Sequence, residues 1–207
     1  MSVIDGRRLM INGSHRIKRN RNMFPATWRS ERLCFSAFEY SDAKRVKALF
    51  EQNQHLQYQD PTFKPWSLST YQALIADSAE KKAPDVEEAF YLRRIQTHDG
   101  KDIGYLQISL NAPDAQSVWL PMLTISPRYQ KHGYGSEAVA SVIETVQAYG
   151  DYRRMGVNVY AENIRAFRFW YQQGFCRISH FEPEQDEGRD YHCLVLYRDL
   201  DVRTPSR

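Results

Sequence analysis

Residues 123–138 read LTISPRYQKHGYGSEA, and this stretch decides the fold class. It joins the apolar end of a β-strand to a polar segment that contains two closely spaced glycines, Gly133 and Gly135. Three side chains that carry or can accept a positive charge stand just before the glycines: Arg128, Lys131 and His132. The pattern predicts a strand, an anion-binding loop and a helix, in that order.

A helix after the glycines is indicated by apolar residues at the spacing of one helical face. Val139, Val142, Ile143 and Val146 recur at i, i+3, i+4 and i+7 before Gly150. The first backbone N–H groups of a helix lack partners, and the helix dipole favours an anion there. Because glycine has no side chain, a phosphate can approach the backbone closely. A phosphate-bearing ligand is therefore expected.

Two other interpretations of the glycine stretch are a dinucleotide fingerprint and an ordinary surface turn. Gly133, Gly135 and Ala138 match the relaxed pattern GxGxxA, but that motif needs its first glycine directly after a strand. Here seven residues, 126–132, separate Ile125 from the first glycine. This offset argues against a nicotinamide or flavin site, while a plain turn stays an alternative.

The periodicity of the remaining segments predicts an α/β domain with a mixed sheet, in the order β-α-α-β-β-β-α-β-α-β-β. Strands are expected in RLCFSAF, AFYLRRIQ, IGYLQISL, SVWLPMLTI, RMGVNVY, FCRISHF and YHCLVLYR. Besides the helix after the glycines, helices are expected after Ser41, from Ser69 to about Ala79, and from Asn163 to Gln173. Residues 54–66, which are aromatic and broken by prolines, and the acidic segment EPEQDEGRD are expected to be loops.

The composition is that of a water-soluble globular protein. Of 207 residues, 42% are hydrophobic and 26% are charged, and the net charge of +3 argues against a polycation that binds nucleic acid. No apolar run approaches the ~18 residues of a membrane span. Three cysteines without a CxxC pair and six histidines without HxxxH or HExxH spacing favour neither a disulfide framework nor a metal site. Because no secretory signal is evident, a cytoplasmic location is expected.

Three segments are expected along the chain: a basic N-terminal arm over residues 1–30, a compact domain over 31–198 and a C-terminal tail over 199–207. Basic side chains in the arm face a single acid, Asp5. The arm is interpreted as a solvated extension, with a contact to nucleic acid or to an acidic partner as the alternative.

Two motifs carry a resemblance to a known family. Gln130-x-x-Gly133-x-Gly135, after a strand and Pro127, resembles the acetyl-CoA signature of the GNAT superfamily of N-acetyltransferases. The second signature follows in the right order: Asn163-x-x-Ala166, an aromatic run and Gly174-Phe175. SERLCFSAFEYSDAKRVKAL and HGYGSEAV look like the branch of ribosomal-protein N-terminal and spermidine acetyltransferases. The resemblance covers residues 31–198 and implies a GNAT-like, mostly antiparallel mixed sheet with helices on both faces.

The resemblance also implies a donor site. The strand WLPMLTI should splay from GVNVY, helped by a bulge at Pro121, and the pantetheine of acetyl-CoA would lie in the gap. The backbone N–H near Leu123 would stabilise the oxyanion. Contacts to acetyl-CoA are expected from Leu123, Thr124, Ile125, Gln130, Lys131, His132, Gly133, Tyr134, Gly135, Ser136 and Asn163, and no metal is expected.

The catalytic acid and base of the family pattern are missing. The position of the usual acid, a tyrosine, holds Trp170, and the neighbouring Tyr171 could serve only if the helix were rotated by about 100°. The position of the usual base, a glutamate, holds Asn158, which cannot accept a proton. His55 or Asp60 in the loop over 54–66 could act instead, although proton loss through water fits the sequence best.

The expected function is acetyl transfer from acetyl-CoA by direct attack of a primary amine. The acceptor could be a protein N-terminus, a lysine, a polyamine or a small amine. The acidic segment EPEQDEGRD could attract a cationic acceptor, or it could be a solvated hairpin tip. The alternative function is a non-catalytic acyl-CoA-binding protein whose arm contacts nucleic acid or another partner. A homodimer is left open.

Overall fold

One twisted sheet organises the chain in the computed structural model, which describes residues 24–79 and 88–200. Most of the expected basic arm, most of the polar break after the second helix and the end of the tail lie outside these residues. The strands are β1 (Thr27–Arg29), β2 (Leu33–Ala37), β3 (Ala89–Thr97), β4 (Asp102–Leu110), β5 (Ser117–Ile125), β6 (Arg154–Tyr160), β7 (Arg177–Asp186) and β8 (Arg189–Asp199). Their order is β1-β2-β3-β4-β5-β6-β8-β7, and only β5 and β6 pair in parallel among these strands. The expected mixed, mostly antiparallel sheet is confirmed.

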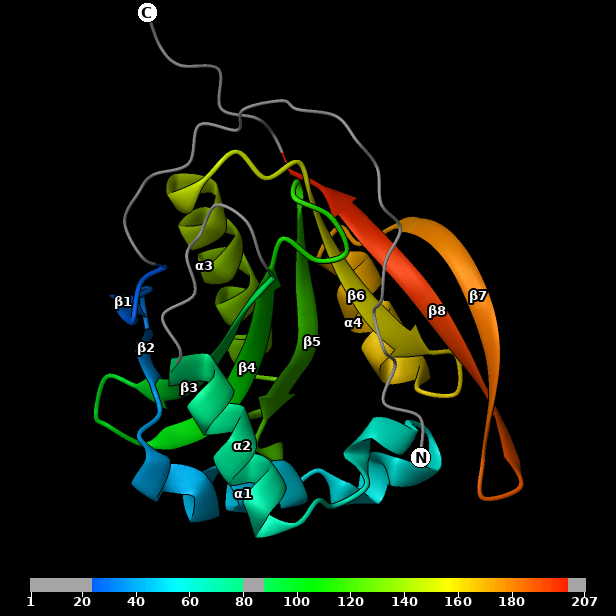
Figure 1. Ribbon diagram of the computed structural model, residues 1–207, viewed down its shortest axis with the longest axis horizontal. Coiled ribbons are helices and arrows are strands. Elements are labelled where there is room, and N and C mark those ends of the chain that lie inside the picture. The colour runs from blue at the N-terminus through cyan, green and yellow to red at the C-terminus, as the bar shows by residue number, and fades with distance from the viewer. Residues whose placement is uncertain (1–23, 80–87, 201–207) are drawn as a thin grey trace, which may run out of the picture.

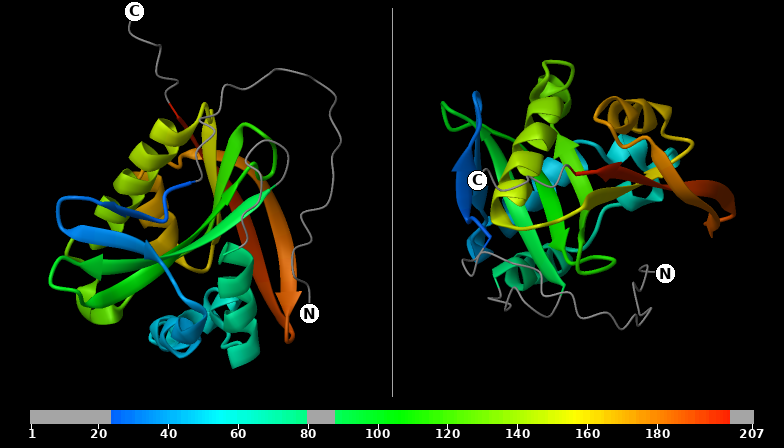
Figure 2. Two further views of the ribbon diagram at one scale, coloured as in Figure 1. Left: turned by 60° about the vertical axis from the view of Figure 1, so that its left-hand side comes forward. Right: turned by 90° about the horizontal axis from the view of Figure 1, so that it is seen from above.

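Helices cover both faces of this sheet (Figures 1 and 2). The α-helices are α1 (Ala43–Glu51), α2 (Leu68–Ala79), α3 (Tyr134–Tyr149) and α4 (Ile164–Gln172). Short 3₁₀ helices are η1 (Tyr40–Asp42), η2 (Gln54–Tyr58), η3 (Pro61–Phe63) and η4 (Pro127–Tyr129). None of the helices in the described ranges is long and apolar enough to cross a membrane.

Two buried clusters lie on opposite faces of the sheet. The periodic residues of α3, namely Val139, Val142, Ile143 and Val146, are buried against one face together with Trp170 and Phe175 from the α4 region. The other face packs against α1 and α2 through Val46, Phe50, Tyr71 and Ile75. The predicted apolar face of α3 is therefore confirmed, and α2 begins earlier than expected because Ser67, not Ser69, accepts the N–H of Thr70 at its start.

The packed domain extends beyond both boundaries expected from the sequence. Phe24 is only 2% exposed, and Trp28 in β1 stacks on Phe35 at 4.6 Å and donates its indole N–H to the Ser141 hydroxyl. At the other end, Leu200 is buried in the same cluster. Phe24 and Trp28 bury apolar surface within a segment whose composition is mostly basic. The packed domain therefore begins before the expected boundary at residue 30.

The acidic segment over 182–190 is a hairpin extension and not a loop. β7 and β8 pair as far as Asp186 and Arg189, which leaves only Glu187 and Gly188 at the turn. Both turn residues have positive φ, 49° and 77°, as a two-residue hairpin turn of the primed type requires.

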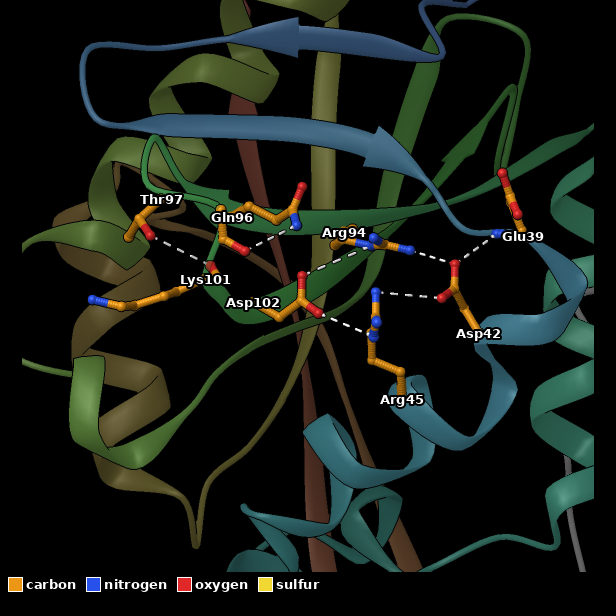
Figure 3. A network of polar contacts seen from close by, with 9 residues as sticks. Glu39, Asp42, Arg45, Arg94, Gln96, Thr97, Lys101 and Asp102 are labelled. Carbon is orange, nitrogen blue, oxygen red and sulfur yellow. Dashed lines mark hydrogen bonds and ion pairs between the residues drawn. The ribbon is translucent and has the colours of Figure 1, made fainter.

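An ion-pair network joins the start of α1 to β3 and β4 (Figure 3). Arg45 contacts Asp42 at 3.4 Å and Asp102 at 3.3 Å, and Arg94 also contacts both carboxylates. Since partly buried charges on three elements are shared in this way, the network fixes α1, and with it the chain that follows α1, against the sheet.

β5 and β6 part after a short paired stretch (Figure 1). They pair only from Ser117 to Trp119 on β5, opposite 154–156 on β6. The last pair is very close: a Cβ on Gly156 would lie 2.3 Å from the Trp119 ring, so only glycine fits there. Immediately beyond, the β4–β5 register shifts where Pro121 stands, as expected for a residue that lacks a backbone N–H. The predicted splay between the strands is therefore present.

Candidate active site

A cavity of about 1230 Å³ occupies the gap between β5 and β6. Its walls come from the diverging halves of these two strands, the start of α3, one side of α4, the η2–η3 segment and β7. Residues 130–136 are called the glycine loop below, and residues 54–63 are called the roof. The cavity lining contains both, so two segments that are far apart in the sequence meet at one site.

The β5 backbone beyond the bulge offers free hydrogen-bonding groups to the gap. Ser126 donates its N–H to the carbonyl of Ile103 on β4 at 2.7 Å. Because hydrogen-bonded residues alternate along an antiparallel strand, Thr124 directs its backbone groups at β4 and Leu123 directs its own at the gap. Leu123 thus lies where its N–H is directed toward the cavity, and its contact with a ligand stays a prediction.

The carbonyl of Ile125, in contrast, is already engaged by side chains. It accepts the Gln130 side-chain amide at 2.8 Å and the Asn53 amide at 3.2 Å. Asn53 also donates to the Thr124 hydroxyl at 2.7 Å and accepts from Gln130 at 3.0 Å. Gln130 and Thr124 therefore hold the loop and the strand together, although both also line the cavity.

The glycine loop turns into α3 through two residues in the left-handed region. Lys131 has φ 63°, and Gly133, which precedes the first residue of α3, has φ 82°. By helix geometry the N–H groups of the first turn have no intrahelical acceptors, so they can bind an anion. A Cβ on Gly135 would lie 3.3 Å from the Phe169 ring of α4. A side chain at this position would therefore press on Phe169, which would have to shift by a few tenths of an ångström.

Arg32 braces the glycine loop from the side away from the cavity. Its Nη1 donates to the carbonyl of His132 at 3.0 Å, and its Nε contacts the Glu137 carboxylate at 2.6 Å. The guanidinium lies 4.5 Å from the centre of the Tyr134 ring. Burial opposes ionisation of Glu137, but hydrogen bonds from Ser30 and Arg32 outweigh it and lower the pKa of this carboxyl.

Side chains of the glycine loop divide between the cavity and the outer surface. The cavity lining includes five described residues of the loop: Gln130, Lys131, Gly133, Gly135 and Ser136. His132 and Tyr134 are not in the lining: the His132 ring bonds to the Gln130 carbonyl at 2.7 Å, and Tyr134 packs under Arg32. Their side chains therefore do not reach the position expected of ligand contacts, and only their backbone groups remain available.

Two cations on α4 also line the cavity, and the sequence motifs did not single them out. Arg165 and Arg168 are exposed and stand three residues apart, which places them on neighbouring positions of one helical face. Together with Lys131 they make the α3–α4 side of the cavity positive. Their i, i+3 spacing directly after Asn163 was the available signal.

Asn163 is a helix cap at the end of β6. Its side-chain oxygen accepts the N–H of Ala166 at 3.2 Å, and its side chain is 4% exposed in the cavity wall. Glu162 next to it is paired with His192 at 2.6 Å and so is held by β8. Burial opposes ionisation of Glu162, but the hydrogen bond from His192 outweighs it and lowers its pKa.

The aromatic residues of α4 argue against the acid role expected of Tyr171. Tyr171 is 54% exposed, stacks on Phe167 at 6.1 Å and is not among the cavity-lining residues described. Trp170 lines the cavity instead and is fixed against Phe175 at 5.0 Å. Since one helical step turns a side chain by about 100°, the helix that directs Trp170 inward directs Tyr171 outward.

The roof is fastened to the β7–β8 hairpin. The Tyr191 hydroxyl donates to the Gln57 carbonyl at 3.3 Å, and Lys64 just after the roof pairs with Asp186 and, at 3.0 Å, with Glu187. These contacts place the β7 side of the hairpin under the roof. Glu182 and His180, which bond to each other at 2.9 Å, line the cavity from this side.

Asp60 is the buried carboxylate of the roof. It caps η3 by accepting the N–H of Thr62 at 3.1 Å, and it is only 9% exposed while lining the cavity. Burial raises the pKa of Asp60, hydrogen bonds from Thr62 and Asn163 act in the opposite direction, and the charge of Glu184 raises it further. Burial, together with the Glu184 carboxylate that its hydroxyl bonds at 2.8 Å, also raises the pKa of Tyr160.

Asn158 lies on β6, at the position where the family pattern has a glutamate. It lines the cavity, and its buried side-chain oxygen has no hydrogen-bond partner among the described residues. An amide can donate and accept hydrogen bonds but cannot take a proton at neutral pH. Asp60 and His55 from the roof, both in the lining, are thus the titratable groups that the sequence proposed and the fold brings to the cavity.

A family comparison matches the middle of the chain. A family model described as the acetyltransferase (GNAT) family matches residues 50–175, which include both motifs and the whole glycine loop. No curated protein sequence matches the chain significantly.

Solved structures share the fold at low sequence identity. A ribosomal L7/L12 alpha-N-protein acetyltransferase in complex with coenzyme A is 14% identical, with a TM-score of 0.68 over 87% of this chain and 99% of its own. Spermidine N-acetyltransferase from Vibrio cholerae, in complex with CoA and spermine, is 15% identical, with a TM-score of 0.66 over 83% and 97%. The ribosomal-protein-S18-alanine N-acetyltransferase from Escherichia coli is 16% identical, with a TM-score of 0.61 over 84% and 98%. At these identities the likeness establishes the fold.

Proposed function

The chain belongs to the GNAT acetyltransferase family, whose co-substrate is acetyl-CoA, and we propose that it transfers the acetyl group by direct attack of a primary amine on the thioester. The observation that carries this proposal is the parting of β5 and β6 beside the start of α3, within one cavity. A gap that exposes strand backbone next to an anion-binding helix start suits a ligand with an amide-containing arm and a pyrophosphate.

The glycine loop and α4 are proposed to hold the phosphates of acetyl-CoA. The N–H groups at the start of α3 supply donors, and Lys131, Arg165 and Arg168 supply positive charge from the rim of the cavity. Positive φ at Lys131 and Gly133 supports this role, because it lets the chain turn sharply from β5 into the start of α3.

Leu123 is proposed to act at the thioester through its backbone N–H. A donor that is fixed in the gap before the reaction stabilises the negative charge that develops on the thioester oxygen. Asn163 is proposed to support the arm of acetyl-CoA from the opposite wall, where it also caps α4. The thiolate that leaves is proposed to receive its proton through water and not from a side chain, since Tyr171 points outward.

The acceptor is proposed to enter between the roof and β7. This side of the cavity carries the carboxylates Asp60 and Glu182, whereas the α3–α4 side carries the cations. Charge of opposite sign on the two walls favours an anionic donor on one side and a cationic amine on the other. A polyamine, a lysine or an N-terminus with basic neighbours therefore suits the site.

The test is turnover with a panel of amines of different charge: 1,4-diaminobutane, benzylamine, alanine amide and Nα-acetyl-lysine amide. Release of the coenzyme A thiol and formation of the acetylated amine are measured, with acetyl-CoA binding followed separately by calorimetry. We expect turnover with at least one amine and the highest kcat/KM for 1,4-diaminobutane, the member of the panel that carries two ammonium groups. Binding of acetyl-CoA without thiol release across the panel would contradict the proposal.

A further inference from the structure

We propose that Asp60 binds the ammonium group of the acceptor and takes its proton before the amine attacks the acetyl thioester. This inference rests on the proposed function and assigns the base of the reaction to a residue of the roof. The β6 position at which the family pattern has a glutamate holds Asn158 here, so the proton needs another acceptor.

Asp60 lies where an acceptor amine can reach it. It lines the cavity together with Thr62 and Phe63 of η3, and the Asn163 side chain at the start of α4 lies close enough to lower its pKa. Asn163 itself stands at the end of β6, on the wall that faces the gap. The carboxylate is thus held between the acceptor side of the cavity and the wall that is proposed to support acetyl-CoA.

The hydrogen bonds of Asp60 fix its orientation and leave room for a substrate donor. One oxygen accepts both the backbone N–H and the hydroxyl of Thr62, and the neighbouring Asn163 amide also favours the charged form. An ionised carboxylate has about four lone-pair sites, so roughly one stays open for an N–H of the acceptor. Since the fixed donors are neutral, none of them can neutralise the charge that an ammonium would meet.

The groups that face Asp60 from the neighbouring elements are acidic or neutral. Glu184 from β7, the Tyr160 hydroxyl from β6 and Cys193 from β8 interact with its charge, and His55 lines the cavity from η2. Lys64, on its own segment, is held by Asp186 and Glu187 on the hairpin.

The surroundings of Asp60 raise its pKa above the ordinary value of a carboxyl group. Burial and the charge of Glu184 raise its pKa toward the operating range, which is the direction that favours general-base catalysis. The other candidates are engaged elsewhere: Glu162 with His192, and His180 with Glu182. His55 shows no hydrogen-bond partner that orients it among the contacts of the described residues.

The proton and electron balance of the step is simple. The ammonium gives one proton to the Asp60 carboxylate, which leaves a neutral amine with a free electron pair. That pair forms the C–N bond to the thioester carbon, and the negative charge on oxygen collapses to break the C–S bond. The electron pair of that bond leaves on sulfur, and a second proton from the nitrogen reaches the thiolate through water. Asp60 then releases its proton to solvent at the open side of the cavity.

Asp60→Asn is the matched test, because asparagine caps a helix as well as aspartate and preserves the bond from Thr62. We expect kcat/KM for the best cationic amine of the panel to fall about 100-fold or more, as for loss of a general base. The dissociation constant for acetyl-CoA should be unchanged. In the wild type, kcat/KM should fall as the pH is lowered through the pKa of Asp60. In the variant, this decrease of kcat/KM at low pH should be missing. Asp60→Glu should recover part of the activity.

Asp190→Asn is the control, because it removes one exposed carboxylate from the β7–β8 hairpin outside the cavity lining. It should leave kcat/KM and the pH profile within about threefold of wild type. If Asp60→Asn also stays within that range and keeps the decrease of kcat/KM at low pH, the Asp60 assignment is wrong while the proposed function stands.

Calorimetry of 1,4-diaminobutane on the protein saturated with coenzyme A separates the two proposals. Binding that is lost in Asp60→Asn and kept in Asp190→Asn supports the binding role of Asp60 even where turnover fails. Turnover without any effect of Asp60→Asn on binding or rate overturns the inference alone. Neither binding nor turnover of any amine overturns both proposals.

Discussion

The glycine loop and the roof line the same cavity, but different kinds of contact hold them. The glycine loop continues directly from β5 into α3, and most of what it offers to the cavity is backbone. The roof depends on side chains that reach more than 100 residues along the chain, such as Asp60 to Asn163 and Gln57 to Tyr191. The two segments therefore differ in how their geometry is specified.

The charged side chains at the glycine loop and at the roof also differ, in sign and in burial. The cations beside the glycine loop, Lys131, Arg165 and Arg168, are exposed, so they attract an anion without fixing its position. The charge of the roof is one buried carboxylate with defined partners. A donor that many related enzymes share needs only backbone groups and diffuse charge, whereas recognition of one acceptor needs a placed side chain.

Gly135→Asp should disrupt the glycine-loop side of this comparison, and it has the largest expected effect on acetyl-CoA binding. Its carboxylate would meet the phosphates of acetyl-CoA at the helix start, and its Cβ would press on the Phe169 ring, 3.3 Å away. We expect the dissociation constant for acetyl-CoA to rise about 30-fold, equivalent to about 2 kcal/mol. Calorimetry measures it, with a thermal melt to verify folding.

Gly188→Asp is the matched control on the acceptor side. Gly188 has a positive φ of 77°, so an aspartate there strains the backbone of the turn, but its Cβ would meet nothing within 4 Å and this hairpin tip is not part of the cavity lining described. Its affinity for acetyl-CoA should equal that of the wild type. A folded Gly135→Asp protein with unaltered affinity would show that the glycine loop does not hold the phosphates.

The donor side could be predicted from the sequence because its signals are local. The apolar period of α3, the glycines at 133 and 135 and the proline at 121 all lie within about 30 residues. Each has one physical meaning: a buried helical face, a close approach and a break in strand pairing. Together they gave the strand, the splay and the helix start correctly.

For the side of the cavity formed by the roof and β7, the sequence predicted individual residues but not how they come together. β7 is an edge strand with almost every residue exposed, so Glu182 to Asp186 lack the apolar alternation that marks a strand and were expected to be a loop. The meeting of Asp60 with Asn163 depends on tertiary packing between segments that are about 100 residues apart. No local pattern encodes such a contact.

The rotation of α4 about its own axis is a further feature that the sequence did not determine. Trp170 and Tyr171 are both aromatic, so composition does not decide which of them faces the cavity. The answer comes from Phe175, which packs on Trp170 at 5.0 Å and so sets the rotation of the helix. Near the N-terminus, similarly, Phe24 is buried in the core and Trp28 packs against it, within a stretch whose basic side chains suggested an arm.

Lys64→Met should weaken binding of the amine without changing binding of acetyl-CoA. It removes the contacts to Asp186 and Glu187 that fasten the end of the roof to the hairpin. Because such pairs are exposed, the KM for the amine should rise only about twofold to fivefold, with the affinity for acetyl-CoA unchanged. Steady-state kinetics with varied amine measures this.

Lys101→Met is the control for a lost lysine charge. Lys101 pairs with Asp99 at 2.7 Å in the turn between β3 and β4, away from the cavity lining. An equal rise of KM in both variants would attribute the effect to net charge and would separate the hairpin contact from acceptor binding.

The smallest expected effect compares the two carboxylates by their influence on stability with pH. Glu137 behind the glycine loop has a lowered pKa, so it binds fewer protons in the folded state than its ordinary value of 4.5 implies. Its stabilising contribution is present above that value and is lost as the pH falls through the lowered folded value. Asp60 has a raised pKa, so the folded state keeps its proton longer, and its contribution becomes less favourable as the pH rises from 3.8 through the raised value.

Melting temperatures of Glu137→Gln and Asp60→Asn relative to wild type should therefore move in opposite directions as the pH rises from about 3 to 6. The Glu137→Gln difference should become more negative by a few degrees, about what loss of a partly buried ion pair gives in a domain of this size. The Asp60→Asn difference should become more positive, because the variant avoids burying a charge. Parallel curves would mean that both carboxylates are structural. Opposite curves fit a carboxylate that braces the fold and one that the fold keeps ready for a proton.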